Sequence, residues 1–212
     1  MADDAAPIAR VGGASLCVTN GALSSRPDGR LAIETSSSRG VVPGSDGQIA
    51  EIRFRYLGPT AGSKPLASGE LRRQIGIKLH AQDTCNLLYV MWHIEPDAKV
   101  AVSVKRNPAW HTHAECHANG YTTMRPNAGI AMPPILPGQA HTLRAELRGS
   151  ELIVLADGRR AWVGTVSGLA GIDGPVGFRT DNASFEFEYF ARIVGSPGPD
   201  RSQSRCVQQP GD

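Results

Sequence analysis

Apolar and polar residues alternate strictly along several short stretches of this chain. Between positions 184 and 190 the aromatic residues share one parity and the glutamates share the other, namely Phe185, Phe187 and Tyr189 against Glu186 and Glu188. Because successive side chains of a β-strand point to opposite faces of a sheet, this pattern predicts a strand with one buried face and one solvated face. Just upstream, residues 152–162 predict two strands joined by a tight Asp157-Gly158 hairpin turn.

Further strands are predicted wherever short apolar runs are separated by Gly, Pro, Ser or Asn. The full set comprises residues 16–19, 31–35, 48–57, 71–81, 86–94, 100–106, 142–148, 151–156, 160–166, 176–180 and 184–194. No stretch keeps an apolar period of 3.6, so helices should be few and short. This number of strands is enough for two stacked sheets around a shared core. Residues 58–69, rich in Gly, Pro and Ser, are expected to form a flexible loop or a rim loop.

Composition agrees with a single all-β domain. The 212 residues include 24 Gly and 15 Pro, and an all-β sandwich can reach this length as one domain. We expect a disordered N-terminal segment (1–10), one domain (11–195) and a tail (196–212). The 22 basic and 20 acidic residues give no electrostatic reason to expect a nucleic acid or an anionic membrane as a partner. No apolar run is long enough to span a bilayer.

The order of these last strands resembles a known superfamily. A Gly/Pro turn, the strand 176–180, the Asp181-Asn182 turn and the alternating strand 184–194 follow the hairpin at Asp157-Gly158. This order resembles the closing strands of the concanavalin A-like lectin/glucanase (laminin-G-like) superfamily. The resemblance implies an all-β fold, a two-sheet antiparallel jelly-roll sandwich.

Four cysteines bear on the compartment. An even count in a β-rich chain favours two disulfides. Sandwiches of the resembled kind bring their first and last strands side by side, which implies a Cys17–Cys206 pair that anchors the tail. Cys85 and Cys116 flank two strands and the following loop, and we expect them to form the second pair. Disulfides would indicate a secreted or periplasmic protein, whereas four free thiols would indicate a cytosolic one.

The three consecutive strands 71–81, 86–94 and 100–106 carry an unusual set of polar residues. Their apolar parity, which includes Trp92 with Val90 and Ile94, is predicted to face inward. The opposite parity would place on one surface Arg72, Gln74, Tyr89, His93, Ser103 and Lys105. Aromatic rings can stack on sugars, and polar side chains can hydrogen-bond to sugar hydroxyls. This surface is therefore a candidate carbohydrate platform. The alternative is an ordinary solvated sheet face.

The loop after these strands concentrates histidine and aromatic residues. Trp110, His111, His113 and Tyr121 are expected to adjoin the platform and complete the ligand surface. A metal held by His111 and His113, with His117 or Glu115, is the alternative. The cupin His-x-His pattern is not matched in full and Cys116 is better used in a disulfide, so we assign no metal here.

A weaker resemblance is to the polysaccharide lyases that act on uronate polymers on the same fold. It rests on Glu70-Leu71-Arg72, which is similar to a strand of the alginate lyases. The family's Gln-(Ile/Val)-His motif is not matched, because Gln74-Ile75 is followed by Gly76, and its Tyr-x-Lys-x-Gly-x-Tyr strand is absent. If the protein is a lyase, the resemblance implies that His111, His113 or Tyr121 abstracts the proton while Arg or Gln holds the substrate carboxylate.

Carboxylates suggest little further chemistry. The Glu-x-Asp-x-x-Glu strand of glucanases on this fold is absent, and Glu186 and Glu188 are interpreted as a solvated face. Asp181 and Asn182 are weak calcium candidates, with a simple Asp-Asn turn as the favoured interpretation.

These observations lead to a secreted jelly-roll module that binds a polysaccharide or another glycan. The first alternative is a polysaccharide-degrading enzyme, a lyase of uronate polymers. The second is a laminin-G-like adhesion domain. The sequence carries no feature that specifies the oligomeric state.

Overall fold

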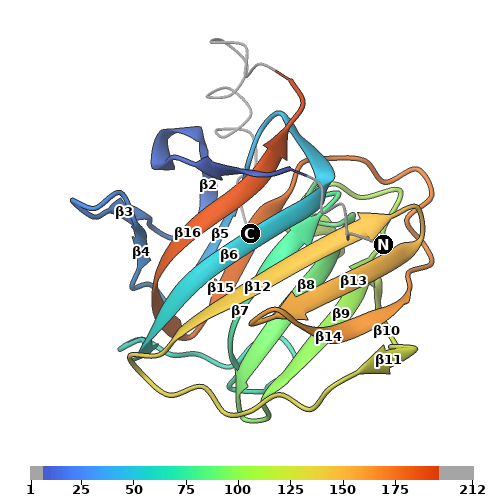
Figure 1. Ribbon diagram of the computed structural model, residues 1–212. Coiled ribbons are helices and arrows are strands. Elements are labelled where there is room, and N and C mark those ends of the chain that lie inside the picture. Colours follow the sequence, from blue (N-terminus) through green and yellow to red (C-terminus); the bar gives the residue numbers. More distant parts are fainter. Residues whose placement is uncertain (1–6, 196–212) are drawn as a thin grey trace.

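The computed structural model describes residues 7–195, which form two antiparallel β-sheets stacked face to face (Figure 1). The nine-stranded sheet has the order β11-β14-β13-β12-β6-β16-β4-β3, and β1 also pairs with β16. The seven-stranded sheet has the order β10-β9-β8-β7-β15-β5-β2. The predicted jelly-roll sandwich is therefore confirmed.

The nine-stranded sheet consists of β1 (Ala9–Val11), β3 (Ser24–Ser25), β4 (Leu31–Ile33), β6 (Ser45–Pro59), β11 (Ala128–Gly129), β12 (Ala140–Arg148), β13 (Glu151–Ala156), β14 (Arg159–Thr165) and β16 (Ala183–Ile193). The seven-stranded sheet consists of β2 (Cys17–Asn20), β5 (Ser37–Val41), β7 (Arg73–Leu79), β8 (Leu87–Glu95), β9 (Lys99–Lys105), β10 (Tyr121–Met124) and β15 (Gly177–Asp181). The two short helical segments are η1 (Gly13–Ser15) and α1 (His113–Cys116).

The core lies between the sheets and is built from the apolar parity of each strand. Trp92 of β8 is fully buried, and its ring lies 5.7 Å edge-on from the ring of Phe54 in β6. Phe54 in turn lies 5.7 Å from Phe185 of β16. The predicted inward face of the strand around Trp92 is confirmed, because Val90, Trp92 and Ile94 all belong to the core between the sheets.

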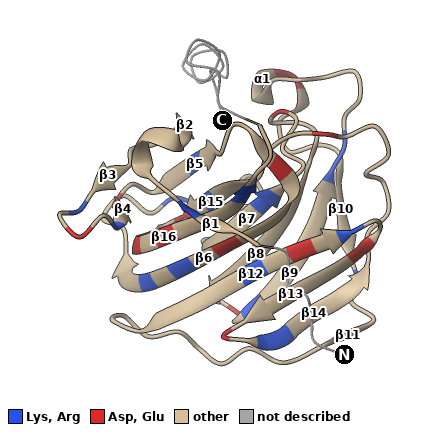
Figure 2. Cartoon of the chain, turned by 45° about the horizontal axis from the view of Figure 1, so that its top comes forward, with Lys and Arg blue, Asp and Glu red and all other residues tan. Residues whose placement is uncertain are grey.

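The hairpin predicted at Asp157-Gly158 joins β13 to β14. Both turn residues have positive φ (50° and 74°), which is the requirement of a type I′ turn. Figure 2 shows that acidic and basic positions are interspersed along the strands of this sheet. There Glu186 pairs with Arg26 and Arg30, and Glu188 pairs with Arg10. The interpretation of both glutamates as a solvated face is confirmed.

Five strands were not predicted, namely β1, β3, β5, β10 and β11. The sequence of β5, Ser-Ser-Arg-Gly-Val, has no apolar alternation, and its position is fixed by pairing with β15 and β2. Strand β1 begins at Ala9, inside the range 1–10 that we expected to lie outside the domain.

The Cys85–Cys116 disulfide is confirmed. The other expected pair involves Cys206, which lies outside the described residues, as does the tail 196–212. Between residues 7 and 195, no helix has the length and apolar character that a membrane-crossing helix needs.

Candidate functional site

A pocket of about 790 Å³ opens on the face of the seven-stranded sheet that points away from the core. Its floor comes from β7, β8, β9 and β15, and its walls come from the loop between β6 and β7 and from the segment that contains α1. Seven of the nine predicted ligand residues line it: Arg72, Gln74, Tyr89, His93, Lys105, His113 and Tyr121. Ser103 of the predicted platform lines it too.

Trp110 and His111 do not line the pocket, so the structure does not bring them together with the other predicted site residues. The Nδ1 atom of His111 lies 2.8 Å from the Asp83 carboxylate, which holds the imidazole on the outside of the loop. The hydrogen bond and charge of Asp83 raise the pKa of His111 above its ordinary value. The backbone carbonyl of Trp110 accepts a hydrogen bond from the Asn86 amide, and its ring is 41% exposed.

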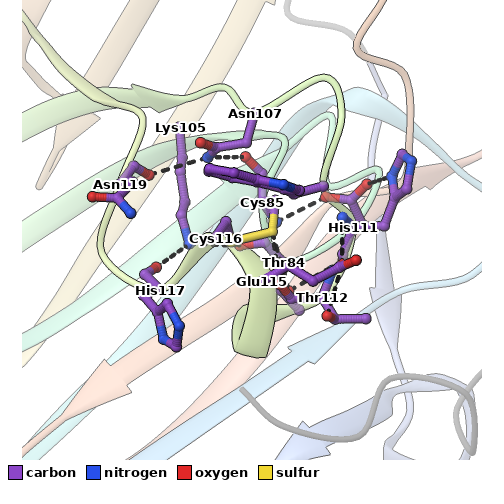
Figure 3. The surroundings of a disulfide bond; sticks show 12 residues. Thr84, Cys85, Lys105, Asn107, His111, Thr112, Glu115, Cys116, His117 and Asn119 are labelled. Atoms are coloured by element: carbon purple, nitrogen blue, oxygen red, sulfur yellow. Dashed lines mark hydrogen bonds and ion pairs between the residues drawn. A yellow bond between two sulfur atoms is a disulfide. The ribbon is translucent and has the colours of Figure 1, made fainter.

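The wall that contains α1 is fastened to the sheet by a disulfide and by Lys105 (Figure 3). The disulfide joins Cys85 to Cys116. The Lys105 amine, which is 1% exposed, donates to the carbonyls of Thr84 (3.0 Å) and His117 (2.8 Å). The Lys105 amine therefore braces the wall, a role that the strand pattern did not predict.

Two tyrosines form an aromatic step at the same end of the pocket. The ring of Tyr121 in β10 stacks on that of Tyr89 in β8 at a centroid distance of 6.0 Å and an angle of 25°. Tyr89 is buried, whereas Tyr121 is 42% exposed. The Lys105 amine lies 5.3 Å from the Tyr121 centroid and adds a cation–π contact. The outer ring is thus held at a fixed tilt with one face supported.

A buried polar network lies on the pocket floor next to Tyr89. The Asp181 carboxylate accepts hydrogen bonds from Gln74 Nε2 (2.6 Å) and Arg179 Nε (2.7 Å), and Arg39 lies 3.4 Å away. These donors take up both carboxylate oxygens, and two cations already balance the charge. Both carboxylate oxygens of Asp181 therefore have partners within the protein.

Asn182 is also used structurally. It has a positive φ of 57° and joins β15 of one sheet to β16 of the other. Its amide donates to the carbonyl of Arg72 (3.0 Å), which fixes one end of the loop between β6 and β7. The favoured interpretation of a structural Asp-Asn turn therefore fits the hydrogen bonds of both residues. Within residues 7–195, no cluster of three or more His, Cys, Asp or Glu is arranged to hold a metal ion.

The pocket concentrates positive charge. The lining residues include six Lys or Arg, namely Arg39, Lys64, Arg72, Lys99, Lys105 and Arg179, but among the described residues only one carboxylate, Asp181. Burial, reinforced by Arg72 and Lys99, lowers the pKa of His93 to about 3. His93 is therefore neutral at physiological pH. The chain as a whole carries a formal net charge of only +2, so its surplus is gathered at this site.

Sequence reasoning missed Arg39, Lys99 and Arg179. In β15, Arg179 follows the buried Phe178, so the alternation of the strand predicts that the Arg179 side chain points away from the core. Its presence in this pocket could not be predicted, because that depends on the pairing of β15 with β7, just over a hundred positions earlier in the chain.

No known protein family matches the sequence, and no curated protein matches it. Similar folds are found among solved structures. The carbohydrate-binding module CBM66 of Bacillus subtilis is 14% identical and has a TM-score of 0.58, with 82% of this chain and 91% of that chain covered. The GH43 protein BlXynB of Bacillus licheniformis, in a mutant form, is 15% identical with a TM-score of 0.52, and the match covers 88% of this chain but 38% of that one. A third structure, described with endo-acting O-glycanases of human gut microbiota that initiate mucin breakdown, is 11% identical with a TM-score of 0.52, covering 91% and 98%. These similarities show the fold alone, a two-sheet jelly-roll sandwich.

Proposed function

We propose that this protein is a carbohydrate-binding module that holds a segment of glycan in the pocket on the seven-stranded sheet. The observation that carries the proposal is the ring of Tyr121, which is supported by Tyr89 and 42% exposed in a pocket that also holds several polar and basic side chains. Sugars pack their apolar faces on such rings, and surrounding polar groups fix their orientation. The likeness to the fold of a module named for carbohydrate binding supports the same function.

Secretion or a periplasmic location belongs to this proposal. The buried Cys85–Cys116 disulfide supports it, because such bonds persist in oxidising compartments. Thiol titration of protein purified from its natural compartment tests it, and two free thiols from this pair would contradict it.

Uronate lyase activity is the second candidate, since His113 and Tyr121 line the pocket together with Arg72 and Gln74. Two observations favour binding without turnover. The position after Gln74-Ile75 is Gly76, so the histidine of the lyase motif is missing. His93, which lies opposite Gln74 on β8, has a pKa of about 3 and is a weak base near neutral pH. The pocket is also concave and carries six Lys or Arg, which favours a glycan over a flat adhesion partner.

The experiment is a glycan-array screen followed by calorimetric titration of the best glycan. Tyr121→Ala should weaken binding at least about fivefold, typical of an aromatic binding residue. Trp110→Ala is the matched control, because Trp110 is equally exposed (41% against 42%) but lies outside the pocket. Equal effects of the two substitutions would contradict the proposed site. Ultraviolet absorbance of the same mixtures reports unsaturated uronate, whose formation by the parent protein would replace binding with lyase activity.

A further inference from the structure

Arg179 holds an unusual position on the pocket floor. Its side chain is 14% exposed, and its Nε donates to Asp181 at 2.7 Å. Its guanidinium carbon lies 5.2 Å from the centroid of the Tyr89 ring. Neither terminal nitrogen has a hydrogen-bond partner within residues 7–195. The Nε edge of the guanidinium is therefore anchored by Asp181, and Arg179 lines the cavity.

Gly76 allows Arg179 to lie there. In the sheet register Arg179 of β15 pairs with Gly76 of β7, which pairs with Met91 of β8. Gly76 carries no side chain on the pocket face, so the guanidinium extends across β7 to Tyr89. An added Cβ would lie 2.4 Å from the carbonyl oxygen of Val90 and 2.5 Å from the Met91 sulfur. The missing side chain thus makes Arg179 part of the pocket centre.

The positive charge of Arg179 is only partly balanced by nearby carboxylates. Asp181 serves two guanidinium groups, those of Arg179 and Arg39, and both arginines are largely buried. A buried cation without a full counter-charge favours the arrival of an anion. The terminal nitrogens of arginine match the two oxygens of a carboxylate or a sulfate, which they bind in a bidentate manner.

We propose that the pocket binds a glycan with an acidic substituent, a carboxylate or a sulfate, and that the terminal nitrogens of Arg179 bind that group. This inference rests on the proposed carbohydrate binding and names the chemical class of the glycan. The Tyr89 ring separates Arg179 from Tyr121, at 5.2 Å and 6.0 Å respectively. The acidic group and the stacked sugar ring therefore occupy opposite ends of the aromatic step.

The first test compares matched ligands on the unaltered protein, so that it does not depend on how a variant folds. A short uronate oligosaccharide is titrated beside its carboxyl-reduced, uncharged counterpart and beside a sulfated form of the latter. We expect the uncharged oligosaccharide to bind at least about tenfold more weakly than the better of the two acidic oligosaccharides, because it lacks the charged hydrogen-bond pair with Arg179. The comparison between uronate and sulfate identifies which acidic group is bound. Equal binding of all three overturns the inference and leaves the proposed function standing, whereas no binding of any glycan overturns both.

The second test replaces the guanidinium. Arg179→Lys keeps the positive charge but removes the planar pair of terminal nitrogens, so the ratio of acidic to uncharged binding should fall several-fold while dependence on Tyr121 is retained. Arg159→Lys, on an exposed position of the nine-stranded sheet, is the control and should leave the ratio unchanged. Near-ultraviolet circular dichroism confirms the fold of each variant. A folded Arg179→Lys protein with the parent's ratio would overturn the role of Arg179.

Discussion

Asn182 and Lys64 form a closed pair of hydrogen bonds, although 118 positions separate them. The backbone N–H of Lys64 donates to Asn182 Oδ1 at 2.8 Å, and Asn182 Nδ2 donates back to the Lys64 carbonyl at 2.7 Å. The buried Asn182 amide therefore pairs with both backbone groups of Lys64, as a neighbouring β-strand would, and so holds the loop between β6 and β7. That loop supplies Lys64, Leu66 and Ser68 to the pocket wall.

Removal of this amide should release the pocket wall. Asn182→Gly keeps the positive φ accessible but removes the hydrogen bonds, so amide hydrogen exchange across residues 64–72 should accelerate. The loss of buried hydrogen bonds should lower the free energy of unfolding by about 1–3 kcal/mol. Asn182→Ala should cost roughly 1 kcal/mol more, because it adds strain at φ 57°. An unchanged exchange rate in Asn182→Gly would show that the loop is held by other contacts.

Trp92 and Trp110 make a matched pair for stability. Trp92→Ala empties a fully buried site between the sheets and should lower the free energy of unfolding by roughly 3–5 kcal/mol. Trp110→Ala, at an exposed ring, should change it by less than about 0.5 kcal/mol. Urea denaturation of both variants provides the measurement. Similar losses would mean that the inward face of β8 is misassigned.

The strands that sequence predicted well share a physical property. The inward face of β8 and the turn at Asp157-Gly158 depend on period-two burial and on local backbone conformation, both of which neighbouring residues encode. Strand β5 lacks that local signal, since its position is decided by partners elsewhere in the chain.

The candidate site divides in the same way. Parity placed Gln74, Tyr89 and His93 on one surface, because they belong to adjacent strands joined by short connections. His111, in contrast, lies in a loop, where residue type does not decide which way a side chain points. There Asp83 holds the imidazole away from the pocket.

His93 should make stability depend on pH. Its pKa is about 3 in the folded protein and near 6.5 when exposed, so the unfolded chain binds more protons between these values. Stability contributed by neutral His93 is therefore complete above about pH 6.5 and falls as the pH drops toward 3. Over this window the parent should lose up to about 1.4 kcal/mol per pH unit more than His93→Gln. Denaturation curves at stepped pH measure the difference, and parallel profiles would contradict it. His111→Gln is the exposed control and should follow the parent in this window.

The disulfide should contribute both to stability and to the pocket. Replacing Cys85 and Cys116 together by Ser opens a loop of 31 residues, which loop-closure entropy values at roughly 3–4 kcal/mol. Denaturation under non-reducing conditions gives the stability, and titration with the best glycan gives the binding. We expect weaker binding as well, since His113 and His117 are carried by the wall that the disulfide holds. Unchanged affinity would show that Lys105 and the other hydrogen bonds of this segment hold the wall without the disulfide.

The strand order around the pocket has a consequence for how the site forms. Arg179 arrives from β15, Gln74 from β7 and Arg39 from β5, and the pairings of β15 join residues 177–181 with 37–41 and 74–78. Contacts between such distant positions close long loops, and this costs chain entropy before the contacts can form. Folding should therefore be slow for a protein of this size. No continuous peptide contains the three groups that meet at Asp181. The recognition surface can therefore be transferred only as a whole sandwich, and an epitope or inhibitor copied from one strand would reproduce none of its charge arrangement.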